Sequence, residues 1–260
     1  MTQDIYDPQY VAALFDRCSK RYRTWSAVSS FGFIWLWRRQ CVSRVMGQRG
    51  AARIADGQVT PPGPGATQVV DLMAGTGEIW PHLLAWDSHL RITAIDISRR
   101  MHDEAVKRLH GQTAGKIRHI AANALETDLP AGIADMVVSS FGLKTFSPQQ
   151  QETLAAQIAR LLQPGGSFAL IEASDPKGWL LRPLYRAYLD RILPLIERIF
   201  LKGAQDFSMI GTYTRNFGDC SHMAEALRAQ GLRVTYKKHF FGCATSVAGH
   251  KPIALPEPSA

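Results

Sequence analysis

The chain has 260 residues, of which 46% are hydrophobic and 20% are charged, a composition that excludes disorder of the whole and is typical of a folded domain. The formal net charge of +8 is scattered over single and paired Lys and Arg residues, and no basic block, ribonucleoprotein motif or finger spacing accompanies it. Nucleic acid is therefore not an expected partner. Cys18, Cys41, Cys220 and Cys243 have no short paired spacing, so we expect reduced thiols and no metal.

The first segment, "MTQDIYDPQY", lacks the basic and then apolar layout of a signal peptide. No run reaches the roughly 18 uninterrupted apolar residues that a membrane span needs. We expect a cytoplasmic protein that is at most peripheral to the inner face of a membrane.

Three regions follow from the pattern along the chain. Aromatic and apolar residues at helical spacing predict two or three helices over 1–55. The Pro- and Gly-rich stretch 56–67, "DGQVTPPGPGAT", predicts a linker, and 253–260 predicts a flexible tail. Between them lies one expected domain, residues 66–252.

Short apolar runs alternate with helix-length segments within that domain. The runs are "QVVDLM", "RITAID", "IRHIAA", "ADMVVSS" and "SFALIEA". This alternation predicts an α/β fold with a mostly parallel sheet and helices on both faces. After residue 232 the pattern changes to two strands joined by a turn near Phe241 and Gly242, which predicts a hairpin that completes the sheet.

A glycine turn follows the first predicted strand in "VVDLMAGTGEIW", residues 69–80. Gly75 and Gly77 allow close approach of a ligand to the backbone. A dinucleotide fingerprint would place a third glycine at position 80, which is Trp80, and a pyrophosphate would be repelled by Glu78. The turn therefore does not match a phosphate-binding loop.

S-adenosylmethionine matches this turn better, because Asp71 and Glu78 can face its positive charge while the glycine amides approach its carboxylate. Asp96 closes the second predicted strand, where a carboxylate accepts hydrogen bonds from ribose hydroxyls. Asn123 and Ala124 follow the third strand and offer a place for the adenine edge. The simpler alternative is a glycine turn with incidental acids nearby.

The chain resembles the ubiquinone/menaquinone C-methyltransferase family of class I S-adenosylmethionine-dependent methyltransferases. The matching segments occur in family order and are "SSFGFIWLWRR", "VVDLMAGTGE", "AIDIS", "ANALETDLP", "SFGLKTFS", "LLQPGGSFALIEASDP" and "GCATSVAGHKP". The resemblance implies a Rossmann-like sheet of seven mostly parallel strands with one antiparallel strand near its end, and a helical N-terminal lid. Packing of the N-terminal aromatics into the core is the alternative to the lid.

The resemblance also implies a cofactor set and a substrate. The expected cofactor-binding residues are Asp71, Ala74, Gly75, Thr76, Gly77, Glu78, Asp96, Ile97, Met101, Asn123, Ala124 and Ser140. The implied acceptor is a prenylated quinol or a related lipophilic aromatic compound, methylated on a ring carbon without a metal. Two alternatives remain: a quinone-modifying reaction of the rhodoquinone type, which installs an amino group, and a non-catalytic protein that binds the cofactor.

On the substrate side the chain departs from the family pattern. The family's Asp and later Asn after Arg21-Tyr22 are Arg23 and Ser26, its Arg-Asn after "SFGL" is Lys144-Thr145, and its His in the closing strand is Val247. We expect the catalytic residues to be Lys144, Tyr22 and Tyr213, with Arg215 as a further candidate, because the segments that hold them border the methyl-transfer pocket in the family.

Residues 180–202 predict a basic amphipathic helix that Pro194 kinks. Leu184, Tyr188, Ile192, Leu195 and Ile199 share one face. Two interpretations remain: a core helix with a solvated basic side, or a surface that contacts lipid or the tail of the acceptor.

Overall fold

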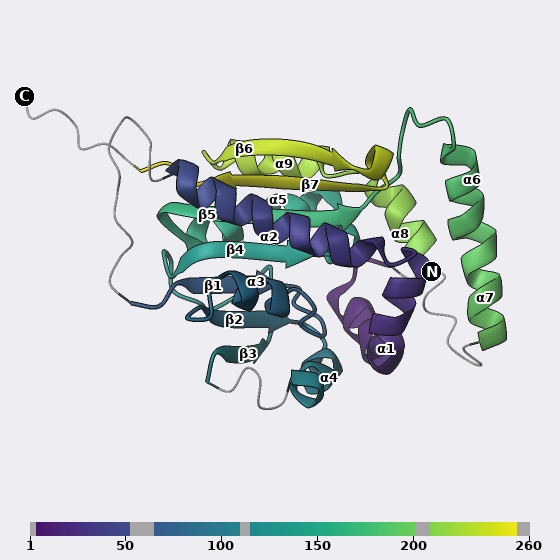
Figure 1. Cartoon of the computed structure of the whole chain (residues 1–260), viewed down its shortest axis with the longest axis horizontal. Helices are drawn as coiled ribbons and strands as arrows, with labels where there is room; N and C mark the ends of the chain where they lie inside the picture. The colour runs from purple at the N-terminus through teal and green to yellow at the C-terminus, as the bar shows by residue number, and fades with distance from the viewer. Residues whose placement is uncertain (1–3, 53–64, 110–114, 201–208, 254–260) are drawn as a thin grey trace, which may run out of the picture.

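Seven strands form one sheet in the computed structural model, which describes residues 4–52, 65–109, 115–200 and 209–253. The strands are β1 (Gln68–Leu72), β2 (Arg91–Asp96), β3 (Ile117–Ala121), β4 (Ala134–Ser140), β5 (Leu162–Ala173), β6 (Arg233–His239) and β7 (Ala244–His250). Their order is β3-β2-β1-β4-β5-β7-β6, and β7 alone runs antiparallel to its two neighbours (Figure 1). The predicted sheet and the predicted hairpin, with its turn at Phe240–Gly242, are confirmed.

Helices cover both faces of the sheet because successive strand residues point to opposite sides. In β4, Met136 and Val138 join one buried cluster, whereas Val137 joins the other. The first face packs against α2 (Phe33–Ala52), α3 (Trp80–Trp86) and α4 (Arg99–Leu109). The second face packs against α5 (Pro148–Leu161) and α9 (Ser221–Ala229).

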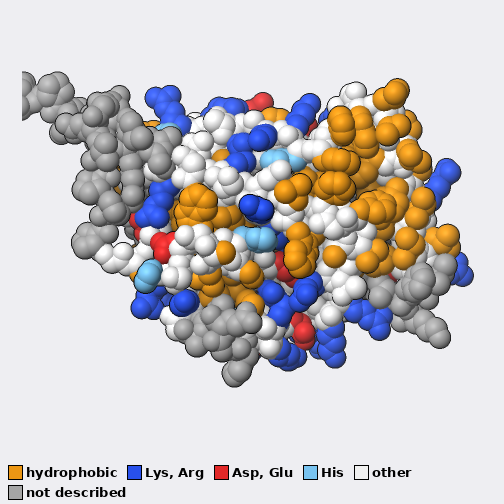
Figure 2. Space-filling model, in the orientation of Figure 1, with side chains coloured by type: hydrophobic (Ala, Val, Ile, Leu, Met, Phe, Trp, Pro, Cys, Tyr) orange, Lys and Arg blue, Asp and Glu red, His pale blue; other side chains and the backbone are white. Residues whose placement is uncertain are grey.

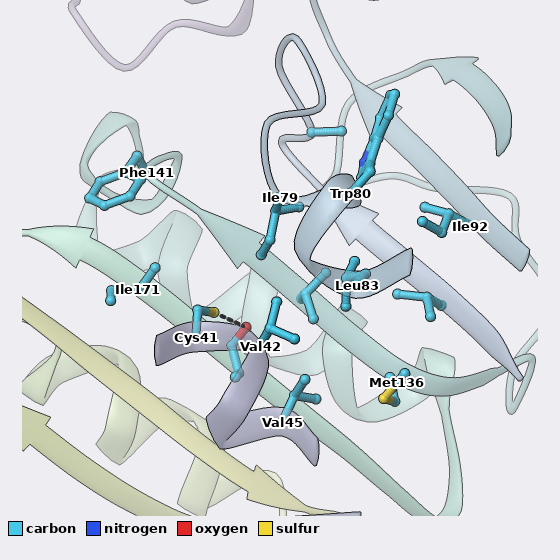
Figure 3. Packing of buried hydrophobic residues seen from close by; sticks show 14 of the residues in the cluster. Cys41, Val42, Val45, Ile79, Trp80, Leu83, Ile92, Met136, Phe141 and Ile171 are labelled. Carbon is cyan, nitrogen blue, oxygen red and sulfur yellow. Dashed lines mark hydrogen bonds between the residues drawn. The ribbon is translucent and has the colours of Figure 1, made fainter. Parts of the chain in front are cut away.

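The two N-terminal helices have different surroundings. Figure 3 shows α2 lying over the strands, with Cys41, Val42 and Val45 directed into the core. The other helix, α1 (Pro8–Ser29), begins at Asp7, whose side chain accepts a hydrogen bond from the backbone N–H of Tyr10 at 2.9 Å. It lies at the carboxyl ends of the parallel strands (Figure 1). The predicted pair of helices thus splits into one core helix and one that covers the end of the sheet.

A third, smaller cluster caps that end. Leu14, Cys18 and Trp25 of α1 pack against Leu189 and Leu193 and against Tyr213 of α8. The segments involved are α6 (Arg182–Ala187), a π-helical stretch η3 (Tyr188–Ile192), α7 (Leu193–Phe200) and α8 (Met209–Phe217). This cap comes from segments nearly two hundred residues apart in the chain.

The predicted helix over 180–202 forms only in part as expected. Its π-helical stretch lies just before Pro194, and the buried positions are Leu189, Leu193 and Glu197 rather than the predicted face. Leu184, Ile192 and Leu195 are exposed. Residues 56–64 of the predicted linker, 254–260 of the predicted tail and 201–202 of the predicted helix lie outside the described residues.

Candidate active site

A cavity of about 660 Å³ opens at the carboxyl ends of β1, β2 and β4. The strand order reverses between β1 and β4, which is where open α/β sheets bind their ligands. The loops that follow the strands supply much of the wall, and α1, the segment before it, α4 and α5 supply the rest. The lining residues include Tyr6, Val11, Phe15, Tyr22, Met73, Gly75, Asp96, Ile97, Met101, Asn123, Ala124, Phe141, Gly142 and Gln150.

The two glycines of the turn after β1 have different roles. Gly75 has φ +56°, and a Cβ built on it meets no atom within 4 Å, so a side chain there would project into the space beside the cavity wall. Gly77 has φ +71°, and a Cβ there would lie 2.4 Å from the Trp80 ring. Gly75 therefore leaves room for a ligand, whereas Gly77 leaves room for Trp80.

Asp96 ends β2 and lines the cavity. Its Oδ2 accepts the backbone N–H of Gly75 at 2.7 Å, and its Oδ1 accepts that of Ser98 at 2.8 Å. Burial raises the pKa of Asp96 above its usual range, against the lowering effect of these two donors. Each carboxylate oxygen keeps acceptor capacity for a further donor.

Asp71 and Glu78 do not line this cavity. Asp71 is 1% exposed beneath the turn, where its Oδ2 accepts the indole N–H of Trp80 at 2.7 Å. Burial raises its pKa to about 8. Glu78 accepts from Arg38 at 3.1 Å and from the hydroxyl of Thr76. Asp71 thus supports the turn through its hydrogen bond with Trp80. Arg38 balances the charge of Glu78.

Of the other expected cofactor residues, some line the cavity and some do not. Ile97, Met101, Asn123 and Ala124 line the cavity. Ala74, Thr76 and Ser140 do not, although the first two belong to the turn after β1 and Ser140 ends β4 beside the cavity residue Phe141. The Asn123 side-chain oxygen accepts the backbone N–H of Leu125 at 3.1 Å, which fixes the loop after β3.

A second cavity of about 700 Å³ adjoins the first beneath the cap. Phe15, Tyr22, Phe141 and Thr145 belong to both walls. The remaining lining is mostly apolar and comes from α1, α2, η2 (Leu143–Thr145), β5 and α8: Leu14, Cys18, Trp25, Ser26, Ser29, Ile34, Lys144, Ala173, Met209 and Tyr213. The structure therefore brings Tyr22, Lys144 and Tyr213 to one cavity, while Arg215 lies outside it and pairs with Asp190.

Lys144 carries the charge in the wall of this second cavity. Its Nζ donates to Glu172 Oε1 at 2.8 Å and to the carbonyl of Phe141 at 3.0 Å, and both charged side chains are buried. Glu172 also accepts the backbone N–H groups of Lys144 and Ala173. Because an ammonium has three donors, one N–H of Lys144 remains for an acceptor oxygen within the described surroundings.

The two tyrosines are held in their protonated forms. Burial and the neighbouring carboxylate Glu78 raise the pKa of Tyr22 well above its usual range. Burial likewise raises the pKa of Tyr213, whose hydroxyl donates to the carbonyl of Ile5 at 2.6 Å. Tyr213 therefore fastens the N-terminal segment to the cap, and Tyr22 faces both cavities as a hydrogen-bond donor.

Several lining residues were not anticipated from the sequence. Tyr6, Val11 and Phe15 reach the first cavity only because α1 folds back over the sheet. Gly142 of the "SFGL" segment gave no sign of its role. A Cβ at this position would lie 2.4 Å from the Cβ of Met73. Glu172 carried no local signal, since its partner Lys144 is 28 residues away.

The fold and the two cavities define the class of protein. The chain has 20% identity, with a TM-score of 0.56, to an O-methyltransferase family protein from Burkholderia thailandensis, covering 92% of this chain and 63% of that one. It has 18% identity, with a TM-score of 0.55, to human N-acetylserotonin methyltransferase in complex with SAM, covering 89% and 58%. The fold is that of a class I SAM-dependent methyltransferase.

The family is narrower than the fold. Residues 3–251 match the model of the ubiE/COQ5 methyltransferase family. Demethylmenaquinone methyltransferases from Anoxybacillus flavithermus and Listeria welshimeri are each 26% identical over 93% of this chain and 95% of their own length. The chain belongs to the ubiE/COQ5 methyltransferase family, and it is a SAM-dependent methyltransferase.

Proposed function

We propose that the chain transfers a methyl group from S-adenosylmethionine to a ring carbon of a prenylated quinol or a related lipophilic aromatic compound. The adjoining cavities are the observation that carries this proposal: one has a strand-end carboxylate, and the other is apolar with one ammonium. The names of the curated relatives support a quinone-related acceptor.

The first cavity fits the cofactor. Asp96 has acceptor capacity for the two ribose hydroxyls, and the open side of Gly75 leaves space for the amino-acid end. The loop at Asn123 and Ala124, which lines the same cavity, would border the adenine. When bound, the cofactor supplies an electrophilic methyl group on a sulfonium.

The second cavity fits the acceptor ring. A ring carbon becomes nucleophilic when an adjacent phenol loses its proton, so a donor near that oxygen stabilises the charge that develops. We assign this stabilisation to the remaining N–H of Lys144, and the orientation of the ring to Tyr22 at the junction of the cavities; both residues line the second cavity. The apolar walls exclude water and direct the acceptor carbon toward the cofactor cavity.

A prenylated acceptor would reside in a membrane, so the enzyme would have to meet it at the membrane surface. We propose that it works in the cytoplasm and contacts the inner membrane face peripherally. Within the described residues no helix is long and apolar enough to cross a membrane.

Isothermal titration with S-adenosylmethionine tests the cofactor half of the proposal. We expect saturable binding with a dissociation constant below about a millimolar. No heat at that concentration would contradict the assignment. Methyl transfer to a short-tailed quinol in detergent tests the acceptor half separately.

A further inference from the structure

One end of the molecule carries an exposed apolar surface, which we call the end patch. Its residues are Phe31, Leu180, Leu181, Leu184, Phe240 and Phe241. Figure 2 shows hydrophobic side chains gathered on the side where Figure 1 places the start of α2, the β6–β7 turn and α6. Exposed apolar patches of this kind mark binding surfaces on soluble proteins.

Ring contacts join the segments that make up the patch. Phe31, in the turn between α1 and α2, packs on Tyr188 with ring centroids 4.8 Å apart. Phe33 packs on Phe240 at 4.4 Å, and Trp179 stacks on Phe241 at 5.4 Å. These ring contacts hold the segments of the patch together as one surface.

Three of its rings are exposed on residues with positive φ. Phe31 is 73% exposed at φ +50°, Phe240 is 46% exposed at φ +42°, and Phe241 is 67% exposed at φ +56°. Bulky side chains seldom adopt positive φ, and exposed aromatic rings gain little from the fold. These positions therefore present their rings outward instead of burying them.

The charges around the patch are basic. The acidic side chains of the neighbouring segment are neutralised within the protein: Asp175 pairs with Arg182, and Asp190 pairs with Arg215. Exposed Lys and Arg side chains without an acidic partner among the described residues lie on the segments that carry the patch or adjoin it: Lys177, Arg191, Arg198, Lys237 and Lys238. An apolar surface on segments with unpaired basic side chains complements an anionic lipid bilayer.

The patch also borders the second cavity. Ser29 and Ile34 line that cavity on either side of Phe31 in the chain. The Tyr188 hydroxyl donates to the carbonyl of Val28 at 3.4 Å, which holds η3 against the same turn.

We infer that the end patch docks on an anionic membrane surface and that a lipid-tailed acceptor enters the second cavity beside Phe31. The route of entry rests on the proposed function, whereas the docking does not. Docking inserts Phe31 and Phe241 among the acyl chains and places the basic side chains at the headgroups.

Vesicle sedimentation of the full chain tests the docking. We expect binding to vesicles of phosphatidylcholine with phosphatidylglycerol, weaker binding at high salt, and little binding to phosphatidylcholine alone. Phe31→Asn combined with Phe241→Asn should weaken binding roughly tenfold or more. Asn tolerates positive φ, so the melting temperature should not fall. Trp86→Asn is the matched control, because Trp86 is similarly exposed but lies on α3.

Two charge-reversal variants separate the electrostatic contribution to vesicle binding from the contribution of apolar insertion. Arg191→Glu should weaken vesicle binding at low salt and have little effect at high salt, whereas Arg118→Glu, on the edge strand β3, should retain it. Wild-type sedimentation of the double Asn variant, or no binding by the wild-type chain, would overturn the inference. So would a patch-dependent dimer that ignores vesicles. Cofactor titration is independent of all these outcomes, so failure here leaves the proposed function standing.

Discussion

The backbone N–H of Gly75 donates to Oδ2 of Asp96 at 2.7 Å, so the glycine turn after β1 and the carboxylate at the end of β2 form one unit. The same carboxylate faces the cavity. A change at Asp96 therefore affects both the ligand contact and the shape of the turn.

Asp96→Ala should weaken S-adenosylmethionine binding by roughly 1.5–3 kcal/mol, the range for hydrogen bonds to a charged group. Isothermal titration measures the loss. Asp103→Ala is the control, since Asp103 is exposed on α4. Equal affinity of Asp96→Ala and the wild type would show that the cofactor lies elsewhere.

Substitution of the two glycines by alanine should affect different properties, cofactor affinity at Gly75 and mainly folding stability at Gly77. Gly75→Ala should reduce cofactor affinity while costing only the roughly 1–3 kcal/mol of folding stability that its positive φ implies, since its Cβ meets open space. Gly77→Ala should cost that amount from its own positive φ and more from the Trp80 contact. Denaturant melts and titrations of both variants check this. The reverse ranking would contradict the assigned roles.

Asp71 should make folding stability fall as pH rises. The folded carboxyl has a pKa of about 8, and the unfolded one has about 3.9. Between these values the unfolded chain releases a proton that the folded chain retains, so stability decreases with pH across this window. Asp71→Asn removes the effect and still accepts the Trp80 N–H. Its melting temperature should exceed that of the wild type most at pH 8 and least near pH 4. A pH-independent difference would contradict this.

Lys144 should matter for turnover more than for cofactor binding. Removing it alone leaves Glu172 as an unpaired buried charge and should unfold the protein. The paired change Lys144→Gln with Glu172→Gln keeps neutral hydrogen-bonding groups. We expect kcat to fall roughly a hundredfold, as when one donor to a developing oxyanion is lost. The affinity for S-adenosylmethionine should stay the same. Unchanged kcat in this folded variant would exclude Lys144 from the reaction.

The sequence predicted the sheet well, and it brought Gly75 and Asp96 to one cavity, because their signals are local. Gly75 follows β1 and Asp96 ends β2, and parallel strands bring their ends together. The cap was harder to predict, because Tyr213 reaches Ile5 only after folding. Asp71 and Trp80 pair beneath the turn, which a residue pattern cannot distinguish from an acid that faces the ligand. The π-helical stretch before Pro194 moved the buried face by one residue.

Mass spectrometry of a lipid extract incubated with the enzyme and S-adenosylmethionine tests the central claim most directly. We expect a quinol product in which one methyl group has replaced a hydrogen. At a low cofactor concentration the Asp96→Ala variant should not form this product. A product in which one methoxy group is exchanged for an amino group, or no new product beside normal cofactor binding, would contradict it.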